Sequence, residues 1–476
     1  MTGRTSKNLY LFPIILSLFF FSCSKIDKTE ITIGIGWEQY KGKNLTIHFI
    51  SENTPPSSSI AALADKFYDL TGIRVIVEQL KLDDMVQKVA LDFSSRTGNY
   101  EAIYVDPYQV LAPFYESLVD LNSFISDTTL PELPNGLGDF IPTQIEAAGW
   151  MISPDKLYSL PYDTPTIIWI YRTDIFNKYK EQFKKDEGFD WTPGANLSWE
   201  QYYIIARWIN DHVPDSEAKY GTGHQAKQHD ALTCDFSNVL WSYGGDYFAT
   251  GDRKGILNPG KCSLTSEASI KAAEFYKKLI DIAHPGSVSW DWNGLAEAFA
   301  AGEIAMAPEW HEHAGMFADP QRSKVAGKVG FALLPHGPSG KSINMWGGSG
   351  IGINKFASQE KQRAAWMFLV WATSAEVQLE TLMKVGGTPT RLSVYDIPDM
   401  KKAMYGPSNL PVMLAGPAVL EAWKEEHIGL RPKTPYWLKI NNVIFTQLST
   451  MLAGNKTPQQ AMQDAAKQID EITGNL

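Results

Sequence analysis

The β-type run Leu45-Thr46-Ile47-His48-Phe49-Ile50 opens the most clearly patterned stretch of the chain. Apolar residues at i, i+3, i+4 spacing predict a helix over about residues 60–70, and a second strand is expected over 74–78. Another helical pattern over about 83–95 leads to the strand Ala102-Ile103-Tyr104-Val105-Asp106. This β-α-β-α-β order predicts a parallel sheet covered by helices, and therefore an α/β fold.

Two acidic residues stand at the ends of these predicted strands. Glu52 follows the first strand and Asp106 closes the third. In a parallel sheet covered by helices, ligands lie beyond the carboxyl ends of the strands. Topology alone therefore places Glu52 and Asp106 at a candidate ligand site.

A similar pattern restarts in the second part of the chain. Ser198 and Gln201 form a capping box before a predicted helix, and Thr457 and Gln460 form another near the end. Further strands and helices are expected over residues 166–171, 270–283, 329–334, 350–354 and 359–373. No internal repeat accompanies them, so the sequence predicts two α/β units joined by extended crossings.

The composition limits the classes of protein to which the chain can belong. Its 476 residues are enough for about two or three domains or one large bilobal one, and 44% apolar residues support a large packed core. The formal net charge is −10 and no basic block occurs, so no nucleic-acid partner is expected. Three cysteines exclude a disulfide scaffold, although a Cys234–Cys262 bridge stays open for an exported protein.

The N-terminus carries the pattern of an export signal. Arg4 and Lys7 precede an apolar run from Leu9 to Phe21, and Ser22-Cys23 follows. Residues 1–22 are therefore predicted to be a signal peptide.

The end of this segment, Phe20-Phe21-Ser22-Cys23, looks like a relaxed bacterial lipobox in which Cys23 becomes the lipidated N-terminus. Phe20 departs from the usual pattern, where Leu is commonest, and an ordinary signal peptide with an incidental cysteine is the alternative. Residues 23–43 would form a polar tether. We expect an exported protein, lipid-anchored to the membrane on its periplasmic or cell-surface side.

The motifs of nucleotide and metal sites fail on their spacing. Gly340-Lys341-Ser342 resembles the end of a P-loop, but Pro335 stands where the motif needs glycine. In Glu309-Trp310-His311-Glu312-His313 the two histidines lie at i, i+2, which does not match a helical zinc motif. We expect this run to be a polar loop with Trp310 as its functional member, and we expect no metal, no cofactor and no catalytic residue.

Three loops place an aromatic ring beside small or polar residues. They are Trp241-Ser242-Tyr243-Gly244-Gly245-Asp246-Tyr247, Met345-Trp346-Gly347-Gly348 and Pro308-Glu309-Trp310. A sugar has apolar C–H faces, which flat rings cover, and a hydroxyl rim, which carboxylates and amides bind. The three loops together favour a ligand of this kind over core packing alone.

The order and spacing of several motifs resemble those of one protein family. The motifs are Leu157-Tyr158-Ser159-Leu160-Pro161-Tyr162, Phe299-Ala300-Ala301-Gly302-Glu303-Ile304-Ala305-Met306, Val385-Gly386-Gly387-Thr388-Pro389-Thr390-Arg391 and Arg431-Pro432. Over residues 45–473 the chain resembles family 1 of the extracellular solute-binding proteins, the maltose-binding-protein-like lipoproteins that serve carbohydrate ABC importers.

The resemblance implies a bilobal, periplasmic-binding-protein-like (type II) α/β fold with a ligand cleft between two lobes. Lobe one would hold residues 44–164 and 347–392, and lobe two residues 165–346 and 393–476. The lobes would close like a hinged clamp on a neutral sugar, oligosaccharide or polyol. A monomer would then deliver this ligand to the permease subunits of the importer.

The resemblance also implies which residues contact the ligand. Lobe one would supply Glu52, Asn53, Asp106, Tyr108 and Tyr162, and lobe two Trp241, Gly245, Asp246 and Trp310, with Trp346, Gly347 and Gly348 beside a crossing and Arg391 on a loop near the cleft.

Two other functions stay open at this point. A secreted glycoside hydrolase would need one acid–base pair of carboxylates, and no spacing among the 53 acidic residues selects one. A surface glycan-capture lipoprotein serving an outer-membrane transporter is disfavoured by the strand runs, since proteins of that class are largely helical.

Overall fold

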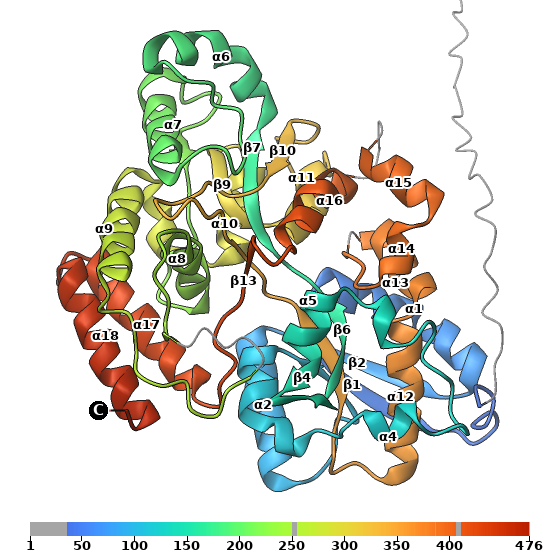
Figure 1. Ribbon diagram of the computed structural model, residues 1–476. Coiled ribbons are helices and arrows are strands. Elements are labelled where there is room, and N and C mark those ends of the chain that lie inside the picture. Colours follow the sequence, from blue (N-terminus) through green and yellow to red (C-terminus); the bar gives the residue numbers. More distant parts are fainter. Residues whose placement is uncertain (1–35, 250–254, 386, 406–410, 476) are drawn as a thin grey trace, which may run out of the picture. The chain divides into compact units, whose positions relative to one another are not determined.

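The structure is a computed structural model that describes residues 36–249, 255–385, 387–405 and 411–475 (Figure 1). The predicted signal peptide over residues 1–22, the predicted lipidation site Cys23 and most of the predicted tether lie outside the described residues. Within the described part, no helix is both long and apolar enough to cross a membrane.

The first main sheet has five strands in the order β2-β1-β3-β12-β6. The strands are β1 (Thr46–Glu52), β2 (Arg74–Leu80), β3 (Ala102–Val105), β6 (Ser159–Asp163) and β12 (Ser349–Ile353). β1 pairs in parallel with β2 and β3, and β12 pairs antiparallel with both β3 and β6. β6 therefore runs in the same direction as β1 and β3, and the carboxyl ends of these strands lie at one edge.

Helices cover this sheet in the order that the sequence predicts. α1 (Pro55–Thr71) packs on β2, α2 (Leu82–Ser95) on β1, and α12 (Gln359–Ala372) on β1, β3 and β12. α13 (Ala375–Val385) packs against α1. The side chain of Thr54 caps α1, and Gly72 ends it in the left-handed conformation that glycine adopts without strain.

Short elements connect β3 to β6. They are η1 (Pro107–Leu111), α3 (Ala112–Phe114), η2 (Tyr115–Ser117), α4 (Asn122–Ile125), η3 (Leu137–Asp139), α5 (Pro142–Gln144), η4 (Ile145–Gly149), β4 (Trp150–Met151) and β5 (Ser153–Leu157).

The second main sheet has four strands in the order β10-β7-β9-β8. The strands are β7 (Ile167–Arg172), β8 (Tyr220–Thr222), β9 (Ile304–Trp310) and β10 (Val329–Ala332). β8 is parallel to β9, whereas β7 is antiparallel to both β9 and β10. β8 and β9 therefore end at the edge where β7 begins.

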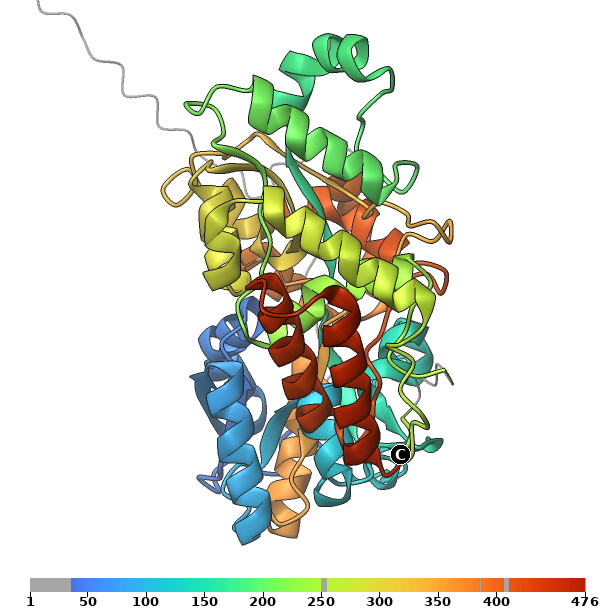
Figure 2. The ribbon, with the colours of Figure 1, turned by 90° about the vertical axis from the view of Figure 1, so that its left-hand side faces the viewer.

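Longer helices pack on the second sheet or on the helices that cover it (Figures 1 and 2). They are α6 (Thr173–Glu187), α7 (Trp199–His212), α8 (Asp230–Ser242), α9 (Glu267–Ile282), α10 (Trp292–Ala300), α16 (Pro411–Ala422), α17 (Trp437–Leu452) and α18 (Pro458–Thr473). Shorter pieces are η5 (Pro285–Ser289), η6 (His311–His313), α11 (Ala314–Ala318), α14 (Leu392–Tyr395), α15 (Pro398–Tyr405) and the parallel pair β11 (Asn344–Met345) and β13 (Ile428–Gly429). Both predicted capping boxes are confirmed, at the starts of α7 and α18.

Two chain segments that pass between the sheets lie side by side. Residues 164–166 join β6 to β7, and residues 346–348 join β11 to β12. Thr166 and Trp346 pair as an antiparallel bridge, and the Gly347 N–H donates to the Pro165 carbonyl at 2.8 Å. The two crossings are therefore hydrogen-bonded to each other.

Much of the aromatic content belongs to the core. Seven tryptophans are less than 2% exposed: Trp169, Trp191, Trp199, Trp208, Trp346, Trp366 and Trp437. Cys234 and Cys262 are buried free thiols, so the disulfide that the sequence left open is not formed.

Candidate functional site

The carboxyl edge of the first sheet carries three acidic residues. Glu52 ends β1, Asp106 follows β3 and Asp163 ends β6. Because these strands are parallel, the three carboxyl groups share one edge, the position where α/β sheets bind ligands. Asp106 is buried, and its Oδ1 accepts the N–H groups of Tyr108 and Gln109 at 2.8 and 2.7 Å. Its carboxylate therefore has a fixed position.

The corresponding edge of the second sheet presents an amide and an aromatic ring. Gln225 follows β8, and Trp310 ends β9. The indole Nε1–H of Trp310 donates to Gln225 Oε1 at 3.2 Å, and both residues are buried. Among the described residues, the buried Nε2 of Gln225 has no hydrogen-bond partner. An amide donor that also orients a ring suits a ligand with both apolar and hydroxyl surface.

The crossing at residues 346–348 brings backbone close to these groups. A Cβ on Gly347 would lie 2.6 Å from Cη2 of Trp310, so only glycine lets this ring lie against the crossing. A Cβ on Gly348 would overlap the Trp346 ring and lie 2.5 Å from the Asp163 carbonyl. The structure thus brings four predicted site residues, Trp310 and 346–348, together beside Asp163.

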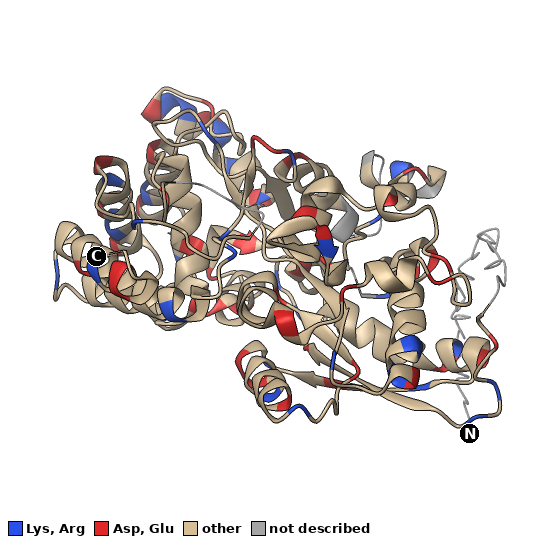
Figure 3. Ribbon diagram, turned by 60° about the horizontal axis from the view of Figure 1, so that its bottom comes forward, with Lys and Arg blue, Asp and Glu red and all other residues tan. Residues whose placement is uncertain are grey.

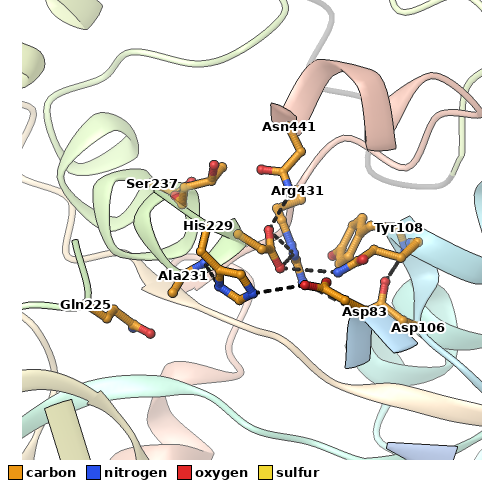
Figure 4. A network of polar contacts seen from close by, with 12 residues as sticks. Asp83, Asp106, Tyr108, Gln225, His229, Ala231, Ser237, Arg431 and Asn441 are labelled. Carbon is orange, nitrogen blue, oxygen red and sulfur yellow. Dashed lines mark hydrogen bonds and ion pairs between the residues drawn. The ribbon is translucent and has the colours of Figure 1, made fainter. Parts of the chain in front are cut away.

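Arg431 links the two sheets through a polar network (Figure 4). Its Nη1 lies 3.0 Å from Oδ2 of Asp230 on α8, and its Nη2 lies 3.9 Å from Oδ2 of Asp106. Its guanidinium carbon lies 4.2 Å from the centre of the Tyr108 ring, a cation–π contact. Asn441 adds a 2.7 Å hydrogen bond to Asp230.

Two further contacts extend this network. Gln109 Nε2 donates to Asp230 at 3.3 Å, and His229 Nε2 lies 3.5 Å from Oδ2 of Asp83 on α2. Burial lowers the pKa of His229, but the hydrogen bond to Asp83 and the charge of Asp230 outweigh it and raise the pKa above its ordinary value. The same hydrogen bond holds the pKa of Asp83 below its usual range.

A second acidic group lies at the crossings. The Tyr104 hydroxyl donates to Asp163 Oδ2 at 3.2 Å, and Glu312 on η6 hydrogen bonds to Asp163 from the other sheet. Desolvation raises the pKa of Glu52 to about 8, and the nearby charges of Asp163 and Asp106 act in the same direction. Desolvation and the charge of Asp163 raise the pKa of Glu312 well above its usual range. At neutral pH the carboxyl group of Glu52 is therefore mostly protonated.

Three predicted site residues, Trp241, Gly245 and Asp246, form a separate group at the C-terminal end of α8. Asp246 Oδ1 accepts the Trp241 Nε1–H at 3.1 Å and the Tyr247 N–H at 2.7 Å. A Cβ on Gly245 would lie 2.7 Å from Oγ of Ser269 at the start of α9. Trp241 lies eleven residues after Asp230 along α8, which is about 16 Å at 1.5 Å per residue. Trp241 thus lies about three helical turns from Asp230.

Arg391 is fully buried among segments that pack around the first sheet. Its Nε donates to the Thr373 carbonyl and its Nη1 to the Pro134 carbonyl, both at 2.7 Å. The guanidinium carbon lies 4.0 Å from the centre of the Phe140 ring. These contacts join three distant parts of the chain, and none of them involves another predicted site residue.

The two remaining predicted residues flank the first edge. Asn53 is exposed next to Glu52, and its N–H donates to the Leu80 carbonyl at 2.8 Å. Tyr162 precedes Asp163 and is buried, with its ring 6.2 and 6.4 Å from those of Phe49 and Tyr104.

Sequence reasoning did not predict Asp163, Gln225 or Asp230 as site residues. Asp163 directly follows the quoted motif that ends at Tyr162, so the position of a motif at a strand end was the available signal. Gln225 and Asp230 have no comparable signal, because only the pairing of β8 with β9 brings them to the edge. Within the described part, no group of three or more His, Cys, Asp or Glu side chains is arranged to hold a metal ion.

Comparison with known proteins identifies the family. The model of the bacterial extracellular solute-binding proteins matches residues 51–379. The chain belongs to this family. The family resemblance seen in the sequence is therefore confirmed, and the protein is a solute-binding component of ABC transporters. Membership of an extracellular family also confirms the expected export, whereas lipid anchoring stays a prediction.

Solved structures confirm the bilobal periplasmic-binding-protein fold. An ABC transporter solute-binding protein of Agrobacterium radiobacter in complex with ribitol is 25% identical, with a TM-score of 0.74 over 90% of this chain and 99% of that chain. A maltose-bound protein of T. maritima is 23% identical, with a TM-score of 0.73 over the same shares of both chains, and shows the fold alone.

The curated relatives are similar over most of the chain. A probable amino-acid ABC transporter periplasmic-binding protein of Sinorhizobium fredii is 25% identical over 418 residues, which is 87% of this chain and 86% of the relative. An erythritol/L-threitol-binding protein of Mycolicibacterium smegmatis is 23% identical over 380 residues, which is 77% of this chain and 74% of the relative.

Proposed function

We propose that this solute-binding protein takes a sugar or polyol between its two sheets and delivers it to the permease of an ABC importer. The observation that carries the proposal is the fixed position of the Trp310 ring. Gln225 accepts its Nε1–H, and Gly347 packs against the ring. A ring held in this way offers a flat apolar surface beside a buried amide donor. Stacking a sugar face on it contributes about 1–2 kcal/mol.

The polar groups around the ring suit a ligand rich in hydroxyl groups. A hydroxyl both donates and accepts hydrogen bonds, so it pairs with the Nε2–H of Gln225 and with carboxyl oxygens alike. A buried donor without a partner costs about 1–3 kcal/mol, which a ligand hydroxyl recovers. The ribitol complex of the Agrobacterium relative supports a solute of this class.

Binding would act through closure of two lobes. We propose that lobe one holds residues 44–164 and 347–392, lobe two holds 165–346 and 393–476, and the paired crossings form the hinge. A ligand that touches both sheets binds the closed form better, so it shifts the population toward closure. The protein would carry out no catalysis and would work as a lipid-anchored monomer.

An amino acid is the alternative solute, because one relative is named for amino-acid transport. Its α-carboxylate needs a cation at the site, and Arg431 is already paired with Asp230 and lies near Asp106. These contacts favour a sugar or polyol.

A thermal-shift screen tests the proposal. Ribitol, erythritol, maltose and other sugars and polyols are compared with the common amino acids, since a ligand stabilises the folded state by RT ln(1 + [L]/Kd). We expect stabilisation by at least one sugar or polyol and its loss in Trp310→Ala. Stabilisation by amino acids alone would contradict the proposal.

A further inference from the structure

Asp163 and Glu312 form a carboxyl pair that joins the two sheets. Asp163 ends β6 in the first sheet, and Glu312 lies on η6, directly after β9 of the second. Asp163 is fully buried and Glu312 is 8% exposed. Two residues from different sheets thus place their acidic groups within hydrogen-bonding distance of each other, away from bulk water.

No side-chain cation balances this pair. Among the described residues, no lysine, arginine or histidine forms an ion pair with Glu52, Asp163 or Glu312. Arg431 is occupied by Asp230. Burial lowers the pKa of the adjacent His311 to about 4, so that ring is neutral at physiological pH. The positive charge that would let both carboxyl groups ionise is therefore absent from the protein itself.

Unsatisfied polar atoms surround the pair. Oε1 of Glu312 is buried and accepts no hydrogen bond from the described residues. The fully buried Trp346 has no partner there for its Nε1–H either. A Cβ on Gly348 would lie within 2.5 Å of both Cε2 of Trp346 and the backbone carbonyl oxygen of Asp163, so this edge of the indole lies close to the backbone of Asp163. An acceptor without a donor and a donor without an acceptor both point to a missing ligand.

We propose that the solute carries an amino group and that its ammonium binds between Asp163 and Glu312. This inference rests on the proposed sugar or polyol function and replaces the neutral ligand expected from the sequence with an amino sugar or amino polyol. An ammonium has three donors, which supply the hydrogen bond that Oε1 of Glu312 lacks. The hydroxyl of a neutral polyol has one donor and brings no positive charge to the pair.

The proposal has a consequence for protons. In the free protein, burial and the charge of Asp163 raise the pKa of Glu312, so the protonated form of Glu312 is favoured when no cation is present. When the ammonium binds, its positive charge balances the carboxylates, and the proton is released to the solvent. A neutral polyol finds the pair still protonated and releases none.

Calorimetric titration of the full chain tests this with matched probes. Glucosamine is compared with glucose, and 1-amino-1-deoxysorbitol with sorbitol, at pH 7 in phosphate and in Tris, whose ionisation enthalpies differ. We expect each amino compound to bind at least tenfold more tightly than its neutral partner and to release about one proton. Equal affinities, or binding of the amino compound without proton release, would overturn the proposal.

Substitution provides a second test. In Glu312→Gln we expect the tenfold preference for the amino compound over its neutral partner to disappear. Glu360→Gln on the exposed start of α12 is the matched control and should keep the preference. A preference that survives in a folded Glu312→Gln would overturn the assignment. Absence of binding by all four probes and by the wider sugar panel would instead contradict the proposed function itself.

Discussion

Oδ2 of Asp83 on α2 and Nε2 of His229 at the start of α8 lie 3.5 Å apart, so an ion pair connects a helix of the first sheet to a helix of the second. This pair, the Gln109–Asp230 hydrogen bond and the Asp106–Arg431 contact lie in one network (Figure 4). The network holds the two sheets together on one side of the site.

The first prediction concerns the pH dependence of this ion pair. The pKa of His229 is raised, so the pair stabilises the closed form fully below the ordinary histidine pKa, and the contribution is lost as pH rises through the raised value. Asp83 has a lowered pKa, so its contribution is lost only in strong acid. Because the Asp83 side chain is 60% exposed, solvent screening limits the contribution to about 0.5 kcal/mol.

Affinity for the solute at pH 6 and pH 8.5 measures this effect. Wild type should lose about twofold more affinity than Asp83→Asn between these values. Taking the difference between the two proteins removes the titration of the other site carboxyl groups. Identical pH profiles would show that the pair does not contribute to closure.

The second prediction concerns Trp310. Replacement by Ala removes a stacking surface and should weaken sugar binding by about 1–3 kcal/mol. Trp366 on α12 is the control, because it is fully buried and donates to the Pro131 carbonyl at 3.2 Å. Trp366→Ala should lower the free energy of unfolding by about 3–5 kcal/mol. If both variants lose the same stability without ligand, Trp310 is a core residue.

The third prediction compares the two glycines of the crossing. Gly347→Ala places a methyl group against the Trp310 ring, so we expect binding to weaken by about 1–3 kcal/mol with a smaller loss of stability. Gly348→Ala meets the Asp163 carbonyl, which cannot rotate away, and should lower stability more. Urea unfolding and calorimetric titration measure the two effects separately. If Gly347→Ala lowered stability more than Gly348→Ala and left binding unchanged, the Trp310 ring would be free to move away from the added methyl group.

The fourth prediction tests Arg391, which the family resemblance placed near the ligand. Its hydrogen bonds to the Thr373 and Pro134 carbonyls predict that Arg391→Met lowers the free energy of unfolding by about 3–5 kcal/mol. The folded fraction should bind solute with nearly unchanged affinity. Arg363→Met removes a more exposed pair with Asp127 and should cost at most about 1 kcal/mol. A large loss of affinity for the solute in Arg391→Met would show that Arg391 contributes to the binding site after all.

The sequence predicts local structure better than it predicts the site. The strands and helices from β1 to β3 follow hydrophobic periodicity, which a local pattern carries. The position of β12 between β3 and β6 does not follow from any local pattern, because the pairing of strands far apart in the sequence depends on the whole sheet. Asp163 reaches the site through the pairing of β6 with β12, and Gln225 reaches it through the pairing of β8 with β9.

Ring-containing loops show the limit of composition as a signal. The loop with Trp241 and Asp246 and the loop with Trp310 look alike in sequence, since each has a ring next to an acid. In the structure Asp246 accepts a hydrogen bond from Trp241 itself, whereas Trp310 pairs with Gln225 from another strand end. The hydrogen bond of the Trp241 indole is made within its own loop. Only the fold shows that the Trp310 indole instead bonds to a residue from a distant part of the sequence. Charge gives no better guide, because basic and acidic residues are interspersed over the helices in Figure 3.

The placement of β12 determines how late the first sheet can be completed during synthesis. At about 5–20 residues per second, a ribosome needs on the order of 20–70 s to reach Ile353. Until then β3 and β6 have no strand between them, and their unpaired edges are open to other chains. A nascent chain that stays unfinished for this long remains suited to export in an unfolded state, and it depends on chaperones to keep those edges from aggregating.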